Sequence, residues 1–307
     1  MSSFIILHQV DIIPEFPEEE ALKGNVEFPV FVKPIDSRGS RGQSVCYTME
    51  ELIPAIEFAK NESSNGDIII EKYIKGSQEF HVTYFFVDGE PYLLRTSDNY
   101  CGSEEMHMEK VVSCAAMPSK FTDNYLNTAH KIVVKMFKNL GMKNGPIFMQ
   151  GFEDNGVFRF FDPGLRFPGV DFELVFKNVF NVDLMKAMVQ IALYDKCDIE
   201  IPNDAVYLDK KRGSVLYLTV KACTVKTIIG EESVRNNPKI VSFLPRCKEG
   251  DVITWAYNVN QRLGEFDILA DNTEDLINSI NFVHKTLLAY DENGDDAIFA
   301  RFDTNRL

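Results

Sequence analysis

The stretch "KPIDSRGSRGQSV" (residues 33–45) places two Gly, two Ser and two Arg in the six residues that follow Asp36. It comes directly after the apolar run "FPVFV" (residues 28–32), which predicts a buried strand that ends at Pro34. The backbone N–H groups of a Gly- and Ser-rich loop in this position can turn toward phosphate oxygens. Two interpretations follow, a phosphate-binding loop or a surface loop whose arginines lie in solvent.

Five residues of this stretch have the chemistry that an anion needs. Gly39 and Gly42 allow the backbone to approach a ligand closely, and Ser37 and Ser40 add hydroxyl donors. Lys33, at the end of the strand, can reach an anion as a mobile point charge. The loop fits neither G-x-x-x-x-G-K-[ST] nor G-x-G-x-x-G. It therefore does not decide between the two interpretations by itself.

The composition restricts the classes of partner. The chain has 307 residues, of which 45% are hydrophobic and 25% charged, and its formal net charge is −14. This length can form one large domain or two ordinary ones. A strongly acidic chain is repelled by nucleic acid and by anionic membrane surfaces, so we expect neither as a partner.

Cysteine spacing and the apolar runs predict a cytoplasmic protein. The six cysteines show no C-x-x-C spacing, which favours reduced thiols over a metal knuckle or a redox motif. The first residues, "MSSFIILHQVDII", have no basic lead and only a short apolar run, so they are not typical of a signal peptide. No run approaches the ~18 apolar residues of a membrane-spanning helix.

The order of predicted elements indicates an α+β fold. Residues 48–61 predict a helix with a capping box from Thr48 to Glu51, in which Pro54 causes a kink or a late start. Asp88-Gly89 predicts a hairpin turn, and helices are predicted over residues 125–141, 173–194 and 273–290. Strands and helices alternate irregularly, and the pattern changes near residue 200. We therefore predict two domains, residues 1–200 and 201–307.

The stretch "IIIEKYIKGSQEF" (residues 68–80) predicts a second buried strand with a charged end. The backbone of Glu71, Lys72, Tyr73 and Ile74 can offer hydrogen bonds to an adenine edge at this strand end. Glu79 can accept hydrogen bonds from ribose hydroxyls, because a carboxylate suits a diol. The alternative is an exposed strand end that bears charges without a ligand.

The stretch "FMQGFEDNGVFRFFD" (residues 148–162) predicts another hairpin. A three-residue loop over 154–156 would pair Gln150 with Phe160 and Phe148 with Asp162. Gln150 and Asp162 would then be diagonal neighbours on one face, on the order of 7–8 Å apart. Two oxygen ligands at that spacing can hold a Mg²⁺ ion that phosphates carry in. The alternative is a polar edge above a Phe-rich core.

Polar residues outside the two strand ends complete the set of candidates. Arg166 follows Asp162 by four residues in "DPGLRFPG", where a guanidinium can clamp a phosphate or an acyl phosphate. The long polar stretch over residues 94–110 contains Arg95, Asp98 and Tyr100, which are either substrate contacts or ordinary loop residues.

Taken in order, these stretches resemble the ATP-grasp superfamily. The resemblance rests on a strand ending in Lys-Pro, a Gly-rich loop, "EKYI" followed by Glu79, and a hairpin ending in Asp-x-x-x-Arg. It covers roughly residues 25–195, and the last hundred residues are similar to the C-terminal subdomain of the carboxylate–amine ligase group. That group includes phosphoribosylglycinamide synthetase, carbamoyl-phosphate synthetase large chains, biotin carboxylase and amino-acid ligases.

The resemblance implies a fold of two α+β subdomains that clasp ATP, with Mg²⁺ as the metal. Lys33 and the loop over 37–42 would close over the phosphates, residues 71–74 would line the adenine and Glu79 the ribose. By the same resemblance the metal ligands would be Gln150 and Asp162, and the catalytic residue beside the transferred phosphoryl group would be Arg166. The family reaction activates a small-molecule carboxylate as an acyl phosphate, which an amine then attacks.

Two departures from the family pattern bear on activity. The usual metal ligands are two acidic residues and an asparagine, whereas this chain has the neutral Gln150, the shorter Asp162, and Gly164 in place of the asparagine. Mg²⁺ should bind more weakly unless the nucleotide supplies most ligands. Only 32 residues precede Lys33, too few for the family's N-terminal domain, and Lys23 is a poor substitute for its second ATP-contacting lysine.

The short stretch before Lys33 leaves three interpretations open. The chain could be a fragment, it could work with a separate subunit or as a homo-oligomer, or it could bind nucleotide without completing a reaction. A non-enzymatic interaction protein on the same fold is the alternative from another class.

Overall fold

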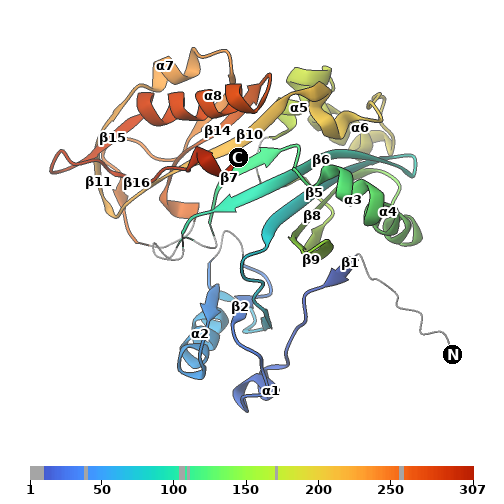
Figure 1. Cartoon of the computed structure of the whole chain (residues 1–307), viewed down its shortest axis with the longest axis vertical. Helices are drawn as coiled ribbons and strands as arrows, with labels where there is room; N and C mark the ends of the chain where they lie inside the picture. Colours follow the sequence, from blue (N-terminus) through green and yellow to red (C-terminus); the bar gives the residue numbers. More distant parts are fainter. Residues whose placement is uncertain (1–9, 38–40, 104–107, 109–110, 170–171, 256–258) are drawn as a thin grey trace.

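The computed structural model describes residues 10–37, 41–103, 108, 111–169, 172–255 and 259–307. Gly39 and Ser40, predicted to bind phosphate, lie outside the described residues. The chain forms a small lobe, drawn in blue at the bottom of Figure 1, and a larger body built on one extended sheet. The strands of the small lobe come from the first quarter of the sequence.

The small lobe is a three-stranded antiparallel sheet covered by one long helix. Its strands β2 (Val30–Pro34), β3 (Ser44–Cys46) and β4 (Ile68–Lys72) lie in the order β3-β2-β4. The helices are α1 (Glu18–Leu22) and α2 (Met49–Glu62). Thr48 caps α2 by accepting a hydrogen bond from the Glu51 N–H, as the capping box predicts, and Pro54 does not delay the helix.

Alternation along β2 decides which of its side chains pack against α2 and which lie on the opposite face of the sheet. Val30 and Val32 are fully buried in a cluster with Leu52 and other apolar residues of α2. Because successive side chains of a strand point to opposite faces, Phe31 and Lys33 lie on the face away from α2. The sheet thus has one apolar face for packing and one face that carries the lysine.

The body is a ten-stranded sheet in the order β1-β9-β8-β5-β6-β7-β10-β14-β12, with β16 paired to β10. Neighbouring strands are antiparallel except for β1 and β9, which are parallel. The strand bounds are β1 (Val10–Ile12), β5 (Gln78–Val87), β6 (Glu90–Cys101), β7 (Val112–Met117), β8 (Gly145–Asp154), β9 (Val157–Gly164), β10 (Arg212–Val220), β12 (Ile240–Pro245), β14 (Arg262–Ala270) and β16 (Ile298–Ala300). Strands from both sides of residue 200 share this sheet, and the two-domain division stays a prediction.

Helices cover both faces of the sheet (Figure 1). One face packs against α3 (Thr122–Thr128), α4 (His130–Asn139) and α8 (Thr273–Thr286), and the other against α5 (Phe172–Phe180) and α6 (Leu184–Tyr194). The remaining elements are α7 (Glu231–Arg235) and a small sheet of β11 (Cys223–Ile229), β13 (Val252–Ile253) and β15 (Leu288–Asp291).

Two of the predicted helices are each split in the structure. The helix predicted over 125–141 is α3 followed by α4, with the break at Ala129. The helix predicted over 173–194 is α5 followed by α6, because Asn181 has a φ of 56° and Asp183 caps the next helix. Apolar periodicity continues through both breaks, so it could not reveal them.

None of the helices within the described residues combines the length and the apolar composition that a membrane-spanning helix needs. The six cysteines, all of them described, form no disulfide.

His284 on α8 gives this fold a specific dependence on pH. Burial and the nearby Arg301 lower the pKa of His284 to about 4, and its Nε2 atom has no hydrogen-bond partner among the described residues. Because the folded pKa lies below the unfolded value of about 6.5, the neutral ring stabilises the fold above pH ~6.5. That stabilisation is lost as the pH falls toward 4.

We therefore expect His284→Phe to flatten this acid-side loss of stability. Urea unfolding of the wild type and the variant at steps between pH 7 and pH 4.5 measures it. Equal falls in the unfolding midpoint for both proteins would contradict the assignment to His284.

Candidate functional site

Lys33 connects the small lobe to the edge of the large sheet. Its Nζ atom donates to Glu71 Oε1 at 2.9 Å, and the two side chains are 14% and 7% exposed. The ammonium also lies 5.3 Å from the ring centroid of Phe161 on β9. Phe31 pairs with Glu71 in the β2–β4 register, so Lys33 and Glu71 share the face away from α2. A cation is thus fixed between the two parts of the molecule.

The environment of Glu71 shifts its pKa upward. Burial raises the pKa of Glu71, Lys33 lowers it in turn, and the carboxylates of Glu15 and Asp162 raise it further. The contact between Lys33 and the ring of Phe161 places this buried ion pair beside the end of β9.

The β8–β9 hairpin brings Gln150 and Asp162 closer than predicted. The sequence-based register is wrong: Asp154 pairs with Val157, and a bulge near Gly151 sets Gln150 directly opposite Asp162. The turn has two residues because Asn155 and Gly156 both have positive φ, 52° and 87°, which suits the twist of a hairpin. The two side chains are direct cross-strand neighbours, not diagonal ones.

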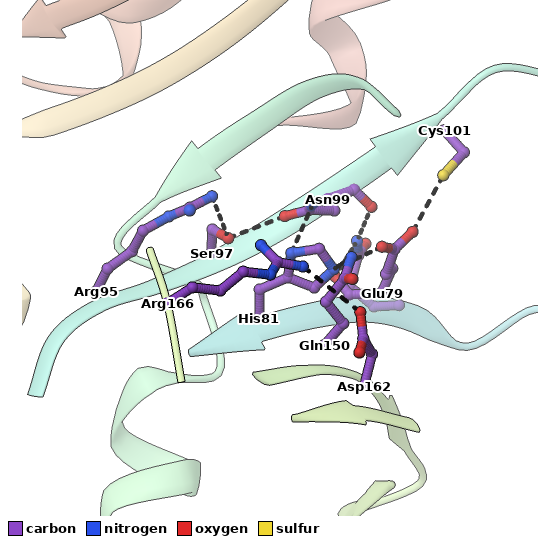
Figure 2. Close-up of polar contacts among 10 residues, drawn as sticks. Glu79, His81, Arg95, Ser97, Asn99, Cys101, Gln150, Asp162 and Arg166 are labelled. Atoms are coloured by element: carbon purple, nitrogen blue, oxygen red, sulfur yellow. Dashed lines mark hydrogen bonds and ion pairs between the residues drawn. The ribbon is translucent and has the colours of Figure 1, made fainter. Parts of the chain in front are cut away.

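Arg166 lies next to Asp162 at the end of this hairpin, as shown in Figure 2. The two charged groups are 3.8 Å apart and about half exposed. The guanidinium lies 5.4 Å from the ring centroid of Phe148 and donates to the carbonyl of Phe167 at 3.0 Å. Arg166 and Asp162 therefore remain accessible to a ligand.

Glu79 is held by two donors at the start of β5 (Figure 2). Its Oε1 atom is 2.6 Å from His81 Nε2, and its Oε2 atom accepts from the Cys101 thiol at 3.1 Å. His81 Nε2 also lies 3.4 Å from the Gln150 amide nitrogen, which is long for a hydrogen bond. Each carboxylate oxygen keeps a lone pair for a further donor.

His81 is absent from the residues predicted from the sequence. Strand alternation places it on the same face as Glu79, two residues earlier, and β8 pairs it with Gln150. That alternation is the signal by which the sequence could have revealed it.

The strand end at residues 71–74 is only partly as predicted. Glu71 binds Lys33, whereas the Lys72 side chain is directed to Glu27 at 3.2 Å. The N–H of Lys72 donates to Pro14 and the N–H of Tyr73 to Pro29. Tyr73 and Ile74 lie in the link between β4 and β5, so an adenine edge would meet backbone carbonyls and the N–H of Ile74.

The stretch over residues 94–110 is not a loop throughout. Arg95, Asp98 and Tyr100 belong to β6 and are buried. Asp98 accepts from Ser119 at 2.6 Å on the face opposite to Arg95, so it is not near the proposed ligand. The prediction of a polar loop fails here because these side chains lie inside the sheet, where Asp98 is hydrogen-bonded while two of the three guanidinium nitrogens of Arg95 have no partner among the described residues.

The loop after β2 closes on α2 through Gly42. This glycine has a φ of 70°, and a Cβ there would lie 2.7 Å from atoms of both Glu62 and Pro34. Ser37, also in the loop, has a buried hydroxyl without a partner among the described residues. Residue 42 therefore has to be glycine for the chain to pass between Pro34 and Glu62 at the end of α2.

We expect Gly42→Ala to destabilise the protein by about 3 kcal/mol, because the loop must move off α2. Gly66→Ala is the matched control in the same lobe. Its φ is 82°, but a Cβ would meet nothing within 4 Å, so the variant should cost only about 1 kcal/mol. Urea unfolding of both variants measures the difference, and equal losses would contradict the close contact at Gly42.

The donor set at the hairpin fits a metal that arrives with phosphates. Within the described residues, no group of three or more His, Cys, Asp and Glu side chains is placed to hold a metal ion. Asp162 and the amide of Gln150 supply two oxygens from adjacent strands. Mg²⁺ commonly takes one or two protein oxygens and completes its shell with phosphates and water, so these residues fit a nucleotide-borne ion.

Comparisons with known proteins relate the chain to one type of domain. Residues 26–158 match the family model described as the ATP-grasp domain. The chain is 28% identical to D-alanine–D-alanine ligase of Fervidobacterium nodosum over 156 residues, 48% of each chain. It is 27% identical to biotin carboxylase of Pseudomonas aeruginosa over 222 residues, 69% of this chain and 47% of that one. The chain thus spans about half the length of these curated relatives.

The fold is shared with a solved structure. The biotin carboxylase domain of 2-oxoglutarate carboxylase from Hydrogenobacter thermophilus aligns with a TM-score of 0.70 at 18% identity, over 92% of this chain and 63% of that one. This agreement and the domain match confirm the α+β fold expected from the order of motifs. Residues 26–158 thus resemble the ATP-grasp domain, and the likeness in fold to the solved structure extends over 92% of the chain.

Proposed function

We propose that this chain binds MgATP and activates a carboxylate as an acyl phosphate for attack by an amine. The observation that carries the proposal is the convergence of Lys33, Asp162 and Arg166 on one side of the sheet. Two of these are cations, one from each part of the molecule: Lys33 lies over the ring of Phe161, the neighbour of Asp162 in the sequence, and Arg166 lies 3.8 Å from Asp162. During phosphoryl transfer, cations stabilise the negative charge on the phosphoryl group, and a carboxylate holds the Mg²⁺ ion that accompanies it.

Each residue has a role that follows from its position. Lys33 would neutralise phosphate oxygens from the small lobe while the loop at Ser37 and Gly42 covers them. Glu79 would accept from the ribose hydroxyls, and the strand end at 71–74 would line the adenine. Arg166 would bind the charge that develops on the transferred group, because its guanidinium is exposed and lies over Phe148.

The proposed chemistry has two steps. A carboxylate oxygen attacks the γ-phosphorus of ATP, the bond to the bridging oxygen breaks, and ADP leaves. An amine nitrogen then attacks the acyl carbon, the C–O bond to phosphate breaks, and the amine loses a proton as phosphate departs. When bound, Mg²⁺ would neutralise phosphate charge, with Gln150 and Asp162 as its protein ligands. The protein contributes mainly positioning and charge neutralisation.

Related proteins support the substrate class. One relative is named as a ligase of D-alanine to D-alanine, and the solved biotin carboxylase domain was crystallised with MgADP and bicarbonate. We infer ATP and Mg²⁺ as the cofactors, a small carboxylate and an amine as the partners, and a cytoplasmic location.

A hydroxylamine trap tests the proposal without knowledge of the amine. The purified chain is incubated with MgATP, hydroxylamine and a pool of amino acids and simple carboxylic acids, and hydroxamates are measured. Hydroxamate formation that depends on ATP and disappears in Arg166→Met supports acyl-phosphate formation. Absence of hydroxamate from a chain that binds nucleotide would favour the alternative described next.

The alternative is a nucleotide-binding subunit that does not complete catalysis alone. The neutral Gln150 and the absence of a side chain at Gly164 favour it, because the metal would have one carboxylate. Such a chain would bind MgATP but need a separate subunit or a second copy for turnover. A non-enzymatic interaction protein on this fold would bind no nucleotide at all.

A further inference from the structure

A continuous chain of hydrogen bonds runs along β6 and β5 to Glu79 (Figure 2). Arg95 donates from one terminal nitrogen to Ser97 Oγ at 2.9 Å, and Ser97 donates to Asn99 Oδ1 at 2.9 Å. The Asn99 amide nitrogen lies 3.1 Å from His81 Nδ1, and His81 Nε2 lies 2.6 Å from Glu79. The five side chains are arranged on one face of two adjacent strands.

The chemistry of the end groups fixes the direction of every bond. A guanidinium only donates, so Ser97 accepts from Arg95 and passes its own hydroxyl proton to Asn99 Oδ1. The amide nitrogen of Asn99 then faces His81, so that Nδ1 must be an acceptor. A neutral imidazole with Nδ1 as acceptor carries its proton on Nε2, where the Glu79 carboxylate at 2.6 Å is a far closer partner than the Gln150 amide nitrogen at 3.4 Å.

The burial of these side chains stabilises this set of hydrogen bonds. Arg95, Ser97, Asn99 and His81 are between 0% and 6% exposed, so water does not compete for their bonds. Turning the Asn99 amide by 180° would present its oxygen to Nδ1 and require a second proton on the ring. Connected buried bonds polarise one another, so the chain restricts the ring more than a single bond would.

We propose that His81 is a positioning residue for the ribose-binding carboxylate. Arg95, acting through Ser97 and Asn99, holds His81 in the Nε2–H tautomer, and His81 fixes one oxygen of Glu79. The Cys101 thiol fixes the other oxygen. Glu79 is thereby held with its remaining lone pairs directed at the ribose. The identification of the Glu79 ligand as a ribose rests on the proposed function, whereas the tautomer of His81 rests on the hydrogen bonds alone.

Asn99→Asp tests the chain directly. An aspartate at this position can only accept, so Nδ1 of His81 must gain a proton. ¹⁵N spectra of the histidine rings, assigned with His81→Gln, should show Nδ1 with a lone pair in the wild type and with a proton in the variant. The ring is then an imidazolium, which binds the Glu79 carboxylate more strongly and competes with the ribose hydroxyls for it, so binding of a non-hydrolysable ATP analogue with Mg²⁺ should weaken by about tenfold.

Asn178→Asp is the matched control, because it adds the same charge on the exposed face of α5, where Asn178 donates to the Leu174 carbonyl of its own helix. It should change neither the His81 spectrum nor the affinity. If Asn99→Asp unfolds the protein, Ser97→Ala breaks the chain without adding charge and should weaken binding in the same direction.

A protonated Nδ1 in the wild type would overturn the tautomer assignment. Unchanged affinity in both folded chain variants would overturn the positioning role. If the wild type binds no nucleotide, the proposed function fails and the ligand role of His81 fails with it. The spectra of the free protein would still decide the tautomer.

Discussion

Lys33→Met is expected to weaken the binding of a non-hydrolysable ATP analogue by about 100-fold, as removal of one partner from a desolvated charge contact does. Lys33 is 14% exposed and is fixed between Glu71 and the ring of Phe161. A cation in this position cannot be replaced by water or by a neighbouring lysine. Calorimetric titration of the wild type and the variant measures the effect.

The loss of affinity in Lys33→Met must be distinguished from a general loss of folding stability. Without Lys33 the Glu71 carboxylate is buried and unpaired, so its pKa, already raised by burial, rises further. The fold then loses stability as the pH rises through that higher pKa. The double variant Lys33→Met with Glu71→Gln removes the unpaired charge and should remain folded without binding the analogue.

Lys60→Met is the matched control for the same substitution. Lys60 lies on α2 of the same lobe, is 34% exposed and pairs with the equally exposed Glu18, so little change in affinity is expected. If Lys33→Met and Lys60→Met bind the analogue equally well, Lys33 is not part of the site.

Asp162→Asn is expected to remove most of the effect of Mg²⁺ on nucleotide binding. Asp162 is the carboxylate that faces Gln150 across the hairpin, and the described residues offer no cluster of three acidic, His or Cys ligands. Two neutral amides bind Mg²⁺ much more weakly than a carboxylate does. The measurement is the affinity for the ATP analogue over a Mg²⁺ titration.

Gln150→Glu should act in the opposite direction. A second carboxylate opposite Asp162 should lower the Mg²⁺ concentration needed for half-maximal binding by about tenfold. A Mg²⁺ titration that neither substitution alters would show that the ion is not bound at this hairpin.

The sequence predicts the strands, the loop and the order of the site residues because each leaves a local signal. A strand with Lys-Pro at its end, a Gly-rich loop and an Asn-Gly turn are decided by residues close together in the chain. The pairing of Lys33 with Glu71 is not local, since β2 and β4 are joined through β3 and α2. Its register depends on packing across the whole lobe.

The remaining errors of the sequence-based predictions concern the register of the β8–β9 hairpin and the burial of polar side chains. The bulge that sets Gln150 opposite Asp162 depends on a close approach at Gly151, where a Cβ would lie 2.3 Å from the Arg159 carbonyl oxygen. No pattern of hydrophobicity records such a contact. Arg95 and Asp98 appeared to belong to a polar loop because composition does not show whether a polar side chain has a partner inside the protein.

The most direct test of the account is calorimetric titration of the purified chain with a non-hydrolysable ATP analogue, with and without Mg²⁺. The account predicts saturable binding that tightens with Mg²⁺ and is lost in the folded Lys33→Met, Glu71→Gln double variant. A folded wild-type chain that gives no binding heat in either condition would contradict the proposal that this site receives MgATP.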